Sequence, residues 1–166
     1  MGIWMARGAH NHQVCVDTAL ERAELVCAKQ NLRFTSLRKT VLELVWKGHE
    51  PVGAYELLDE LAKQGRSASP PTVYRALEFL LQAGLVHKLD SLNAFVGCAD
   101  PESGRHSAFL ICRSCKLVDE LSAETIERDI AALSASHDFF PERHTVEVEG
   151  LCGACREAEQ PSAAKS

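Results

Sequence analysis

Two Cys-x-x-Cys pairs constrain this chain more than any other feature of its sequence. Cys112 and Cys115 form the first pair, and Cys152 and Cys155 form the second, with 36 residues between the pairs. Two residues between cysteines let a tight turn direct both thiolates at one ion, and two such pairs supply the four soft ligands of a tetrahedral zinc site. A closed site of this kind leaves no coordination position open, so we expect a structural zinc rather than a catalytic one.

Other interpretations of the pairs are a thioredoxin-like redox centre or inert core cysteines. The second pair follows a predicted strand and a Gly-Leu dipeptide, which is not the βαβ context of a thioredoxin motif. The longest apolar run is about five residues, far short of the roughly 20 that span a membrane, and the N-terminus lacks the apolar stretch of a signal peptide. We therefore expect a cytoplasmic protein with no membrane partner, where clustered cysteines indicate metal binding.

The chain of 166 residues, 46% hydrophobic and 25% charged, has the size and composition of one or two small packed domains. A segment rich in Pro, Gly and charge, Asp100 to Arg105, is the best candidate boundary. The expected divisions are a flexible arm over 1–16, a helical domain over 17–98, a hinge over 99–105, a zinc-binding domain over 106–156 and a flexible tail over 157–166.

Four helices and a hairpin are predicted in the first half. The first helix runs from Asp17 or Thr18 to about Asn31, and the second from Thr35 or Ser36 to Gly48. The third follows Pro51 and ends before the loop that begins at Gly65, and the fourth runs from Ser69 to Gly84. The hairpin strands are Leu85 to Leu89 and Ala94 to Cys98. This order is that of a winged-helix DNA-binding domain, although many small α+β domains share it.

A small α+β unit is predicted in the second half. Its elements are strands from His106 to Ile111 and from Lys116 to Leu121, a helix capped by Ser122, and an alternating strand from His144 to Glu149. Charge divides the same way: residues 1–90 hold 11 Lys/Arg and 10 Asp/Glu, whereas residues 91–166 hold 7 and 13. The net charge of −5 argues against non-specific polyanion binding by the whole molecule but leaves a nucleic-acid surface open on the first half.

Four further potential ligands come from the expected hinge and from both sides of it: His87, Cys98, His106 and Glu120. Imidazole, thiolate and carboxylate together suit zinc, but a histidine in a hairpin is often only a surface residue. Of the remaining cysteines, Cys27 lies on an apolar helix face and fits a buried core thiol, and Cys15 has no obvious partner.

At this point the chain resembles a known family over roughly residues 17–156. The segment PPTVYRAL at 70–77, followed by GLVH at 84–87, is similar to the recognition-helix signature of the ferric uptake regulator (Fur) family. The segment AFVGC at 94–98, then His106 and the two Cys-x-x-Cys pairs, resembles its zinc uptake regulator branch. Iron-sensing members usually carry a His-rich cluster before the first pair. Here only His106 stands there, which favours zinc.

The resemblance implies an N-terminal winged helix, a C-terminal α/β dimerisation domain, and a homodimer that represses zinc-uptake genes by binding double-stranded operator DNA. It implies two zinc ions per chain. The structural zinc would lie on Cys112, Cys115, Cys152 and Cys155, and the regulatory zinc on His87, Cys98, His106 and Glu120. It places Thr72, Tyr74 and Arg75 on the DNA-facing helix and Tyr55 at a DNA-backbone contact. Asp119 is an alternative to Glu120, because neighbouring side chains on a strand point to opposite faces.

Three other functions compete with a zinc-responsive repressor. A sensor of iron, manganese or peroxide in the same family is disfavoured by the missing His cluster. A zinc deaminase needs His-x-Glu and Pro-Cys-x-x-Cys, and the sequence has neither, so we expect no enzyme and no small-molecule substrate. A zinc module without DNA contact is disfavoured by the segment TVYR at 72–75 and by basic residues Arg33, Arg38 and Lys39.

Overall fold

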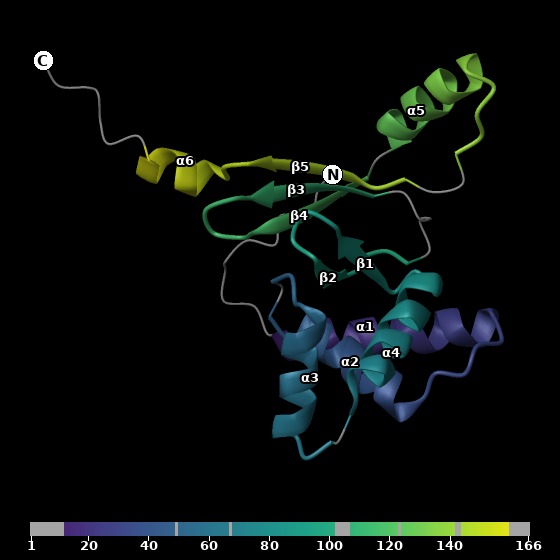
Figure 1. Ribbon diagram of the computed structural model, residues 1–166, viewed down its shortest axis with the longest axis vertical. Helices are drawn as coiled ribbons and strands as arrows, with labels where there is room; N and C mark the ends of the chain where they lie inside the picture. The colour runs from purple at the N-terminus through teal and green to yellow at the C-terminus, as the bar shows by residue number, and fades with distance from the viewer. Residues whose placement is uncertain are drawn as a thin grey trace, which may run out of the picture. The chain divides into compact units, whose positions relative to one another are not determined.

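The computed structural model describes residues 12–48, 50–66, 68–101, 107–122, 124–141 and 144–159. It divides the chain into two compact units, with the division between residues 101 and 107. The first unit contains four helices and a hairpin, and the second contains a three-stranded sheet and two helices (Figure 1). No helix in the described residues is both long enough and apolar enough to cross a membrane.

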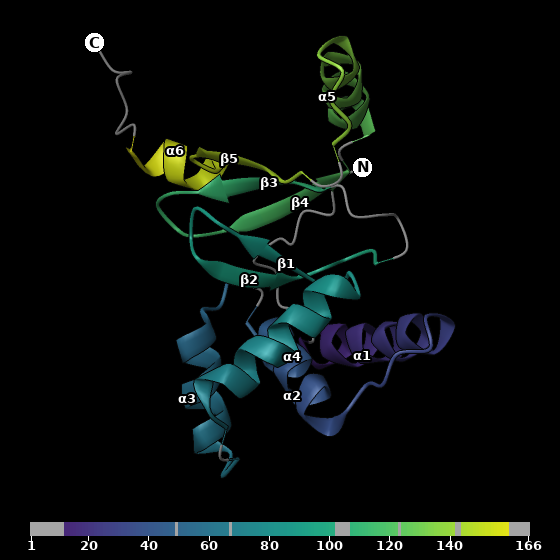
Figure 2. The same cartoon turned by 45° about the vertical axis from the view of Figure 1, so that its right-hand side comes forward.

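The first unit has the winged-helix order that the sequence predicts. Its elements are α1 (His12–Lys29), α2 (Ser36–Trp46), α3 (Ala54–Lys63), α4 (Pro70–Gln82), β1 (Val86–Leu89) and β2 (Ala94–Gly97). The strands pair antiparallel, with His87 opposite Val96. Helix α2 is central, because it packs against α1, α3, α4 and β2 (Figure 2).

Local sequence signals explain where these helices begin and end. The Thr35 side chain accepts a hydrogen bond from the Arg38 N–H at the start of α2, and the Glu56 carboxylate accepts one from the Gly53 N–H, at 2.7 Å, at the start of α3. Helix α4 has prolines in its first turn, where no N–H is needed. It ends before Gly84, whose φ of +72° suits glycine.

The start of α1 differs from the prediction. Residues 12–16 were expected to belong to a flexible arm, with Asp17 or Thr18 as the helix cap, but α1 begins at His12. The Gln13 side chain donates to the Asp17 carboxylate at 2.8 Å, one helical turn away, so Asp17 supports the helix from inside its first turns. Residues 1–11 lie outside the described part of the chain.

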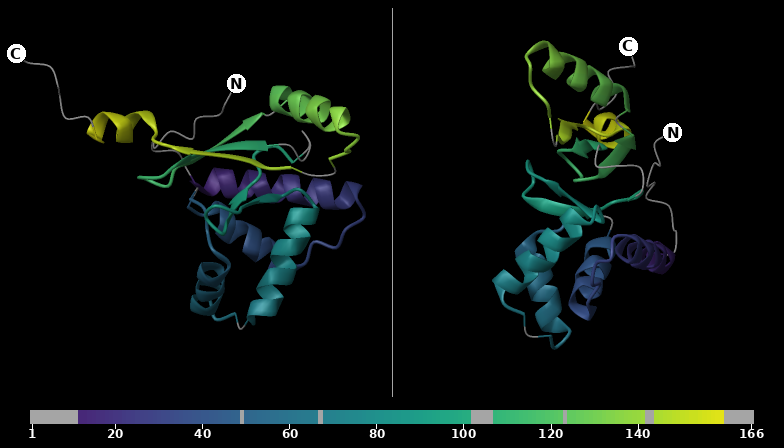
Figure 3. Two further views of the ribbon diagram at one scale, coloured as in Figure 1. Left: turned by 45° about the horizontal axis from the view of Figure 1, so that its top comes forward. Right: turned by 90° about the vertical axis from the view of Figure 1, so that its right-hand side faces the viewer.

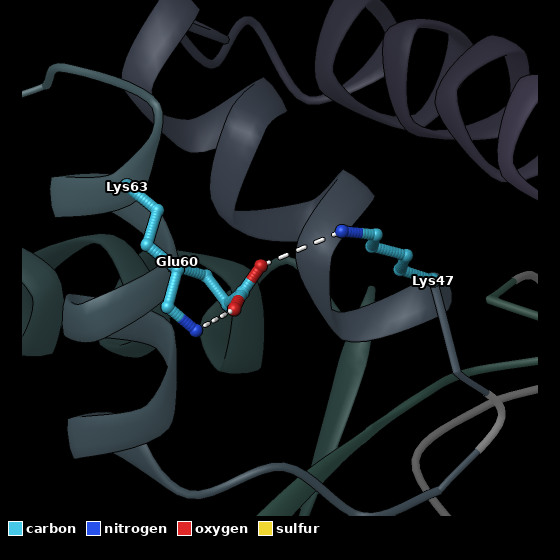
Figure 4. Close-up of polar contacts among 3 residues, drawn as sticks. All are labelled: Lys47, Glu60 and Lys63. Carbon is cyan, nitrogen blue, oxygen red and sulfur yellow. Dashed lines mark hydrogen bonds and ion pairs between the residues drawn. The ribbon is translucent and has the colours of Figure 1, made fainter.

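An exposed ion-pair network connects the end of α2 to α3 (Figure 4). Glu60 on α3 pairs with Lys63 of the same helix at 2.6 Å and with Lys47, the C-cap of α2, at 3.4 Å. The hydrogen bond and charge of Lys63, followed by those of Lys47, lower the pKa of the Glu60 carboxyl. Because water screens exposed ion pairs, the network contributes little to the stability of the unit.

The second unit is built on a sheet with the strand order β4-β3-β5. Its elements are β3 (Ser107–Cys112), β4 (Val118–Ser122), α5 (Glu124–Ser136), β5 (Val146–Gly150) and α6 (Gly153–Glu159). Strand β3 is antiparallel to β4 and parallel to β5. Helices α5 and α6 extend from opposite ends of the sheet (Figure 3).

Helix α6 corrects the expected start of the flexible tail. Residues 157–159 were assigned to that tail, but they continue α6 as far as Glu159. The Glu159 carboxylate lies 3.6 Å from the guanidinium of Arg113, which belongs to the turn after β3. An ion pair of this kind, between residues far apart in the sequence, leaves no periodic signal to predict it. Residues 160–166 lie outside the described part of the chain.

Candidate metal centre and DNA-facing helix

The four cysteines of the two Cys-x-x-Cys pairs meet in the second unit. Their four sulfur atoms all lie within 4.8 Å of one another. The sheet explains this, because β3 and β5 are parallel neighbours whose carboxyl ends share one edge, with Cys112 paired to Gly150. Cys115 ends the turn after β3, and Cys152 and Cys155 lie at the start of α6.

The sulfur spacing fits a zinc ion. A Zn–S bond of about 2.3 Å puts the sulfurs of a regular tetrahedron about 3.8 Å apart, and the Cys115 and Cys152 sulfurs are 3.7 Å apart. A disulfide would bring its two sulfurs to about 2.05 Å, and all four thiols are free. Both the donor set and its geometry therefore suit structural zinc.

The surroundings of two of the thiols shift their pKa values in opposite directions. The backbone N–H groups of Cys115 and Cys152 point at the Cys112 sulfur and lower its pKa to about 6. For Cys155, a hydrogen bond from Ser114 favours the thiolate, but the thiols of Cys152, Cys115 and Cys112 outweigh it and raise the pKa to about 11. Negative charges on sulfur atoms this close together repel one another. A divalent cation at their centre would offset this repulsion.

Two of the four predicted regulatory ligands lie together in the first unit. His87 is on β1 and Cys98 follows β2, and a ring nitrogen of His87 lies within 4.8 Å of the Cys98 sulfur. The Cys98 N–H donates to the Leu85 carbonyl at 3.0 Å, which extends the hairpin ladder to this residue. The Cys98 side chain is only 4% exposed.

The other two predicted ligands belong to the segment after the first unit. Glu120 lies on β4 opposite Phe109, whereas Asp119 lies opposite Leu110 and faces the other side of the sheet. Burial raises the pKa of the Asp119 carboxyl. The two carboxylates therefore cannot both face one ligand site. His106 lies outside the described residues.

The start of α4 exposes the residues expected to meet DNA. Tyr74 is 47% exposed and Arg75 is also exposed, while Val73 and Ala76 beside them are buried. Thr72 is half-buried, and its hydroxyl lies 2.9 Å from that of Ser69, the N-cap. Tyr55, near the start of α3, is 69% exposed.

Two of the basic residues before α4, Arg38 and Lys39, contact other residues of the first unit. The Arg38 guanidinium lies 3.5 Å from the centre of the Phe79 ring of α4 and donates to the Arg33 carbonyl. Lys39 forms an ion pair with Glu24 of α1. Sequence reasoning counted Arg38 and Lys39 as evidence for DNA contact, but in the structure both connect helices. Arg38 thus connects α2 to α4.

A winged helix joined to a small α/β unit with a four-cysteine metal centre defines a class of metal-binding, DNA-binding regulator. Comparison with known families is more specific. The sequence model of the ferric uptake regulator family matches residues 29–149. The chain belongs to the ferric uptake regulator family.

Relatives within the family carry zinc in their names. The chain is 43% identical to the zinc uptake regulation protein of Escherichia coli (strain K12) over 141 residues, covering 84% of this chain and 82% of that one. It is 31% identical to the zinc uptake regulation protein of Mycobacterium tuberculosis (strain H37Rv), covering 75% and 95%. A solved structure of a zinc uptake regulator complexed with zinc and DNA has a TM-score of 0.82 and 41% identity, covering 87% and 97%. These findings confirm the family and zinc-branch assignment.

Proposed function

We propose that the chain is a zinc-responsive transcriptional repressor that binds operator DNA as a zinc-loaded homodimer and represses zinc-uptake genes. The observation that carries this proposal is its likeness, over 87% of the chain, to a zinc uptake regulator complexed with zinc and DNA. No catalytic step is part of this function. Because its partner is chromosomal DNA, we place the protein in the cytoplasm.

Two zinc ions per chain would serve different purposes. Cys112, Cys115, Cys152 and Cys155 would hold a structural ion that joins the turn after β3 to α6. His87, Cys98, His106 and Glu120 would hold a regulatory ion, and the proximity of His87 to Cys98 supports this part. Zinc would supply only coordinate bonds at this second site. By holding the ion, these four residues would fix the chain that follows the hairpin. This would favour the arrangement of the protein that binds DNA.

The DNA surface would be the start of α4. Residues near the N-terminus of a recognition helix are those that reach base edges in the major groove, and Tyr74 and Arg75 are exposed there. Thr72 would contribute from the first turn of the same helix. Tyr55 would contact the phosphate backbone from α3, a role that its exposed phenol allows.

The second unit supports a homodimer. Helix α5 has no buried residue, although it carries apolar side chains along one face. Ile126 and Leu133 of this helix are exposed, as are Phe139 and Phe140 just beyond it. Apolar surface of this kind commonly marks a protein interface, and a two-fold dimer would present two recognition helices to two half-sites.

An iron, manganese or peroxide sensor is the alternative within the family. The soft Cys98 thiolate in the proposed regulatory set favours zinc over these harder ions.

Metal counting and operator titration at buffered free zinc test the proposal together. We expect two zinc ions per chain at saturation and one after mild chelation. Operator affinity should fall by about 5–150-fold between these states, which is the usual range of allosteric coupling. A protein that holds one zinc and binds its operator equally well with and without added zinc would contradict the proposal.

A further inference from the structure

Arg22 of α1 contacts the chain directly after Cys98. Its Nη1 donates to the carbonyl oxygen of Ala99 at 2.5 Å, a contact between residues 77 apart in the sequence. Both residues belong to the first unit. The next residue of α1, Ala23, is fully buried, and α1 packs against α2, so the arginine projects from a helix that is fixed to the body of the unit.

The segment Cys98–Ala99 is therefore held at both ends. The Cys98 N–H donates to Leu85 on one side, and the Ala99 carbonyl accepts from Arg22 on the other. Between these two bonds the Cys98 thiol is kept within 4.8 Å of a ring nitrogen of His87. Only the first bond continues the hairpin ladder. The second depends on a single side chain from another element.

We infer that Arg22 is a positioning residue for the Cys98 thiolate, an inference that rests on the proposed regulatory site. Groups that orient metal ligands commonly change metal affinity by 10–100-fold when removed, although they never touch the metal. Without Arg22, the Ala99 carbonyl loses the hydrogen bond that connects it to α1, and the segment after β2 gains freedom. Zinc binding must then order that segment, and the affinity falls by that cost.

Thiol reactivity tests this inference without regulatory zinc. In the full chain carrying only its structural zinc, Arg22→Ala should increase the alkylation rate of Cys98 by about two- to tenfold, the range expected for losing one solvent-exposed hydrogen bond. Cys27, which is 2% exposed in the same unit, is an internal control read by the same peptide mass spectrometry. Its rate should stay unchanged. An equal rise at both cysteines would mean general destabilisation and would overturn the inference.

Zinc affinity is the second measurement. Competition with a chelator should show the regulatory site of Arg22→Ala weakened by about tenfold, with the structural zinc retained. Arg22→Lys, which keeps the charge and one donor, should recover part of both effects and serves if the alanine variant folds poorly. Glu24→Gln, on the same helix as Arg22, removes the ion pair between Glu24 and Lys39 of α2 and should change neither measurement.

The outcomes separate this inference from the proposed function. A wild-type chain that binds one zinc would refute the regulatory site itself. If the wild-type chain binds two zinc ions, but Arg22→Ala has the wild-type zinc midpoint or the wild-type Cys98 alkylation rate, only the role of Arg22 is overturned.

Discussion

Arg75 is the residue whose exposure most directly suggests a contact with DNA. It is exposed in the first turns of α4, whereas the nearby residues Val73 and Ala76 are buried. Arg75→Ala should weaken operator binding by about 1–3 kcal/mol if the side chain reads a guanine, and the loss should be confined to one base position. A phosphate contact would instead weaken all sequences alike and reduce the salt dependence.

Fluorescence anisotropy with the operator and single-base variants, at matched salt, measures this effect. Arg128→Ala, at an exposed position on α5, removes the same charge from the second unit and should leave the affinity unchanged. Equal operator affinity for Arg75→Ala and the wild type would remove Arg75 from the interface.

Residue identity and spacing allowed the four-cysteine centre to be predicted, because Cys-x-x-Cys turns have few other uses. The sequence did not show that Cys112 ends one strand and Cys152 follows its parallel neighbour, since strand order depends on contacts between distant segments. The roles of Arg22 and Arg38 were equally hidden. Each contacts a residue far away in the sequence, and no local pattern records such a contact.

At the scale of elements, the packing of β2 on α2 depends on Gly97. A Cβ at this position would lie 2.2 Å from the indole ring of Trp46, which is buried. Gly97→Ala should therefore destabilise the first unit by about 1–3 kcal/mol, the usual cost of overpacking. Gly48→Ala is the matched control in the same unit, because the nearest atom to its Cβ would be 3.9 Å away.

Urea unfolding of the two variants and the wild type, followed by circular dichroism, gives the comparison. A lower midpoint for Gly97→Ala alone is expected. Equal midpoints for Gly97→Ala and Gly48→Ala would show that Trp46 moves aside without cost.

The proposed structural zinc would also act at the scale of elements, because Cys112 ends β3 and Cys155 lies on α6. Cys112→Ser should lower the zinc content by one per chain and unfold the second unit, since metal binding in small domains is also folding energy. Cys15→Ser, outside both ligand sets, should change neither the zinc content nor the melting temperature. Metal analysis with thermal melts measures both. A Cys112→Ser protein with unchanged zinc and melting temperature would contradict the assignment.

Helix boundaries followed from the sequence at several positions that Pro, Gly or a cap marks, as at Ser69, Gly84 and Thr35. The start of α1 and the end of α6 were missed, because neither has a clear apolar period. Contacts such as those between Gln13 and Asp17 and between Arg113 and Glu159 are visible only in the structure.

For the whole molecule, the account rests on two zinc sites with separate effects. The four-cysteine centre would maintain the second unit, while Cys98 belongs to the first unit and would respond to changes in zinc. The sequence could suggest this division from the positions of the ligands along the chain. It could not decide between Glu120 and Asp119 as the carboxylate ligand, because that choice depends on which face of β4 is turned toward the metal.

Operator binding of Cys98→Ser across a range of buffered free zinc tests this claim most directly. Serine keeps the size of the side chain but removes the soft thiolate that zinc prefers. The variant should retain one zinc per chain, its fold and its dimer, and should lose the zinc-dependent part of operator affinity. A Cys98→Ser protein that still binds its operator only when zinc is added, with the wild-type zinc midpoint, would contradict the account.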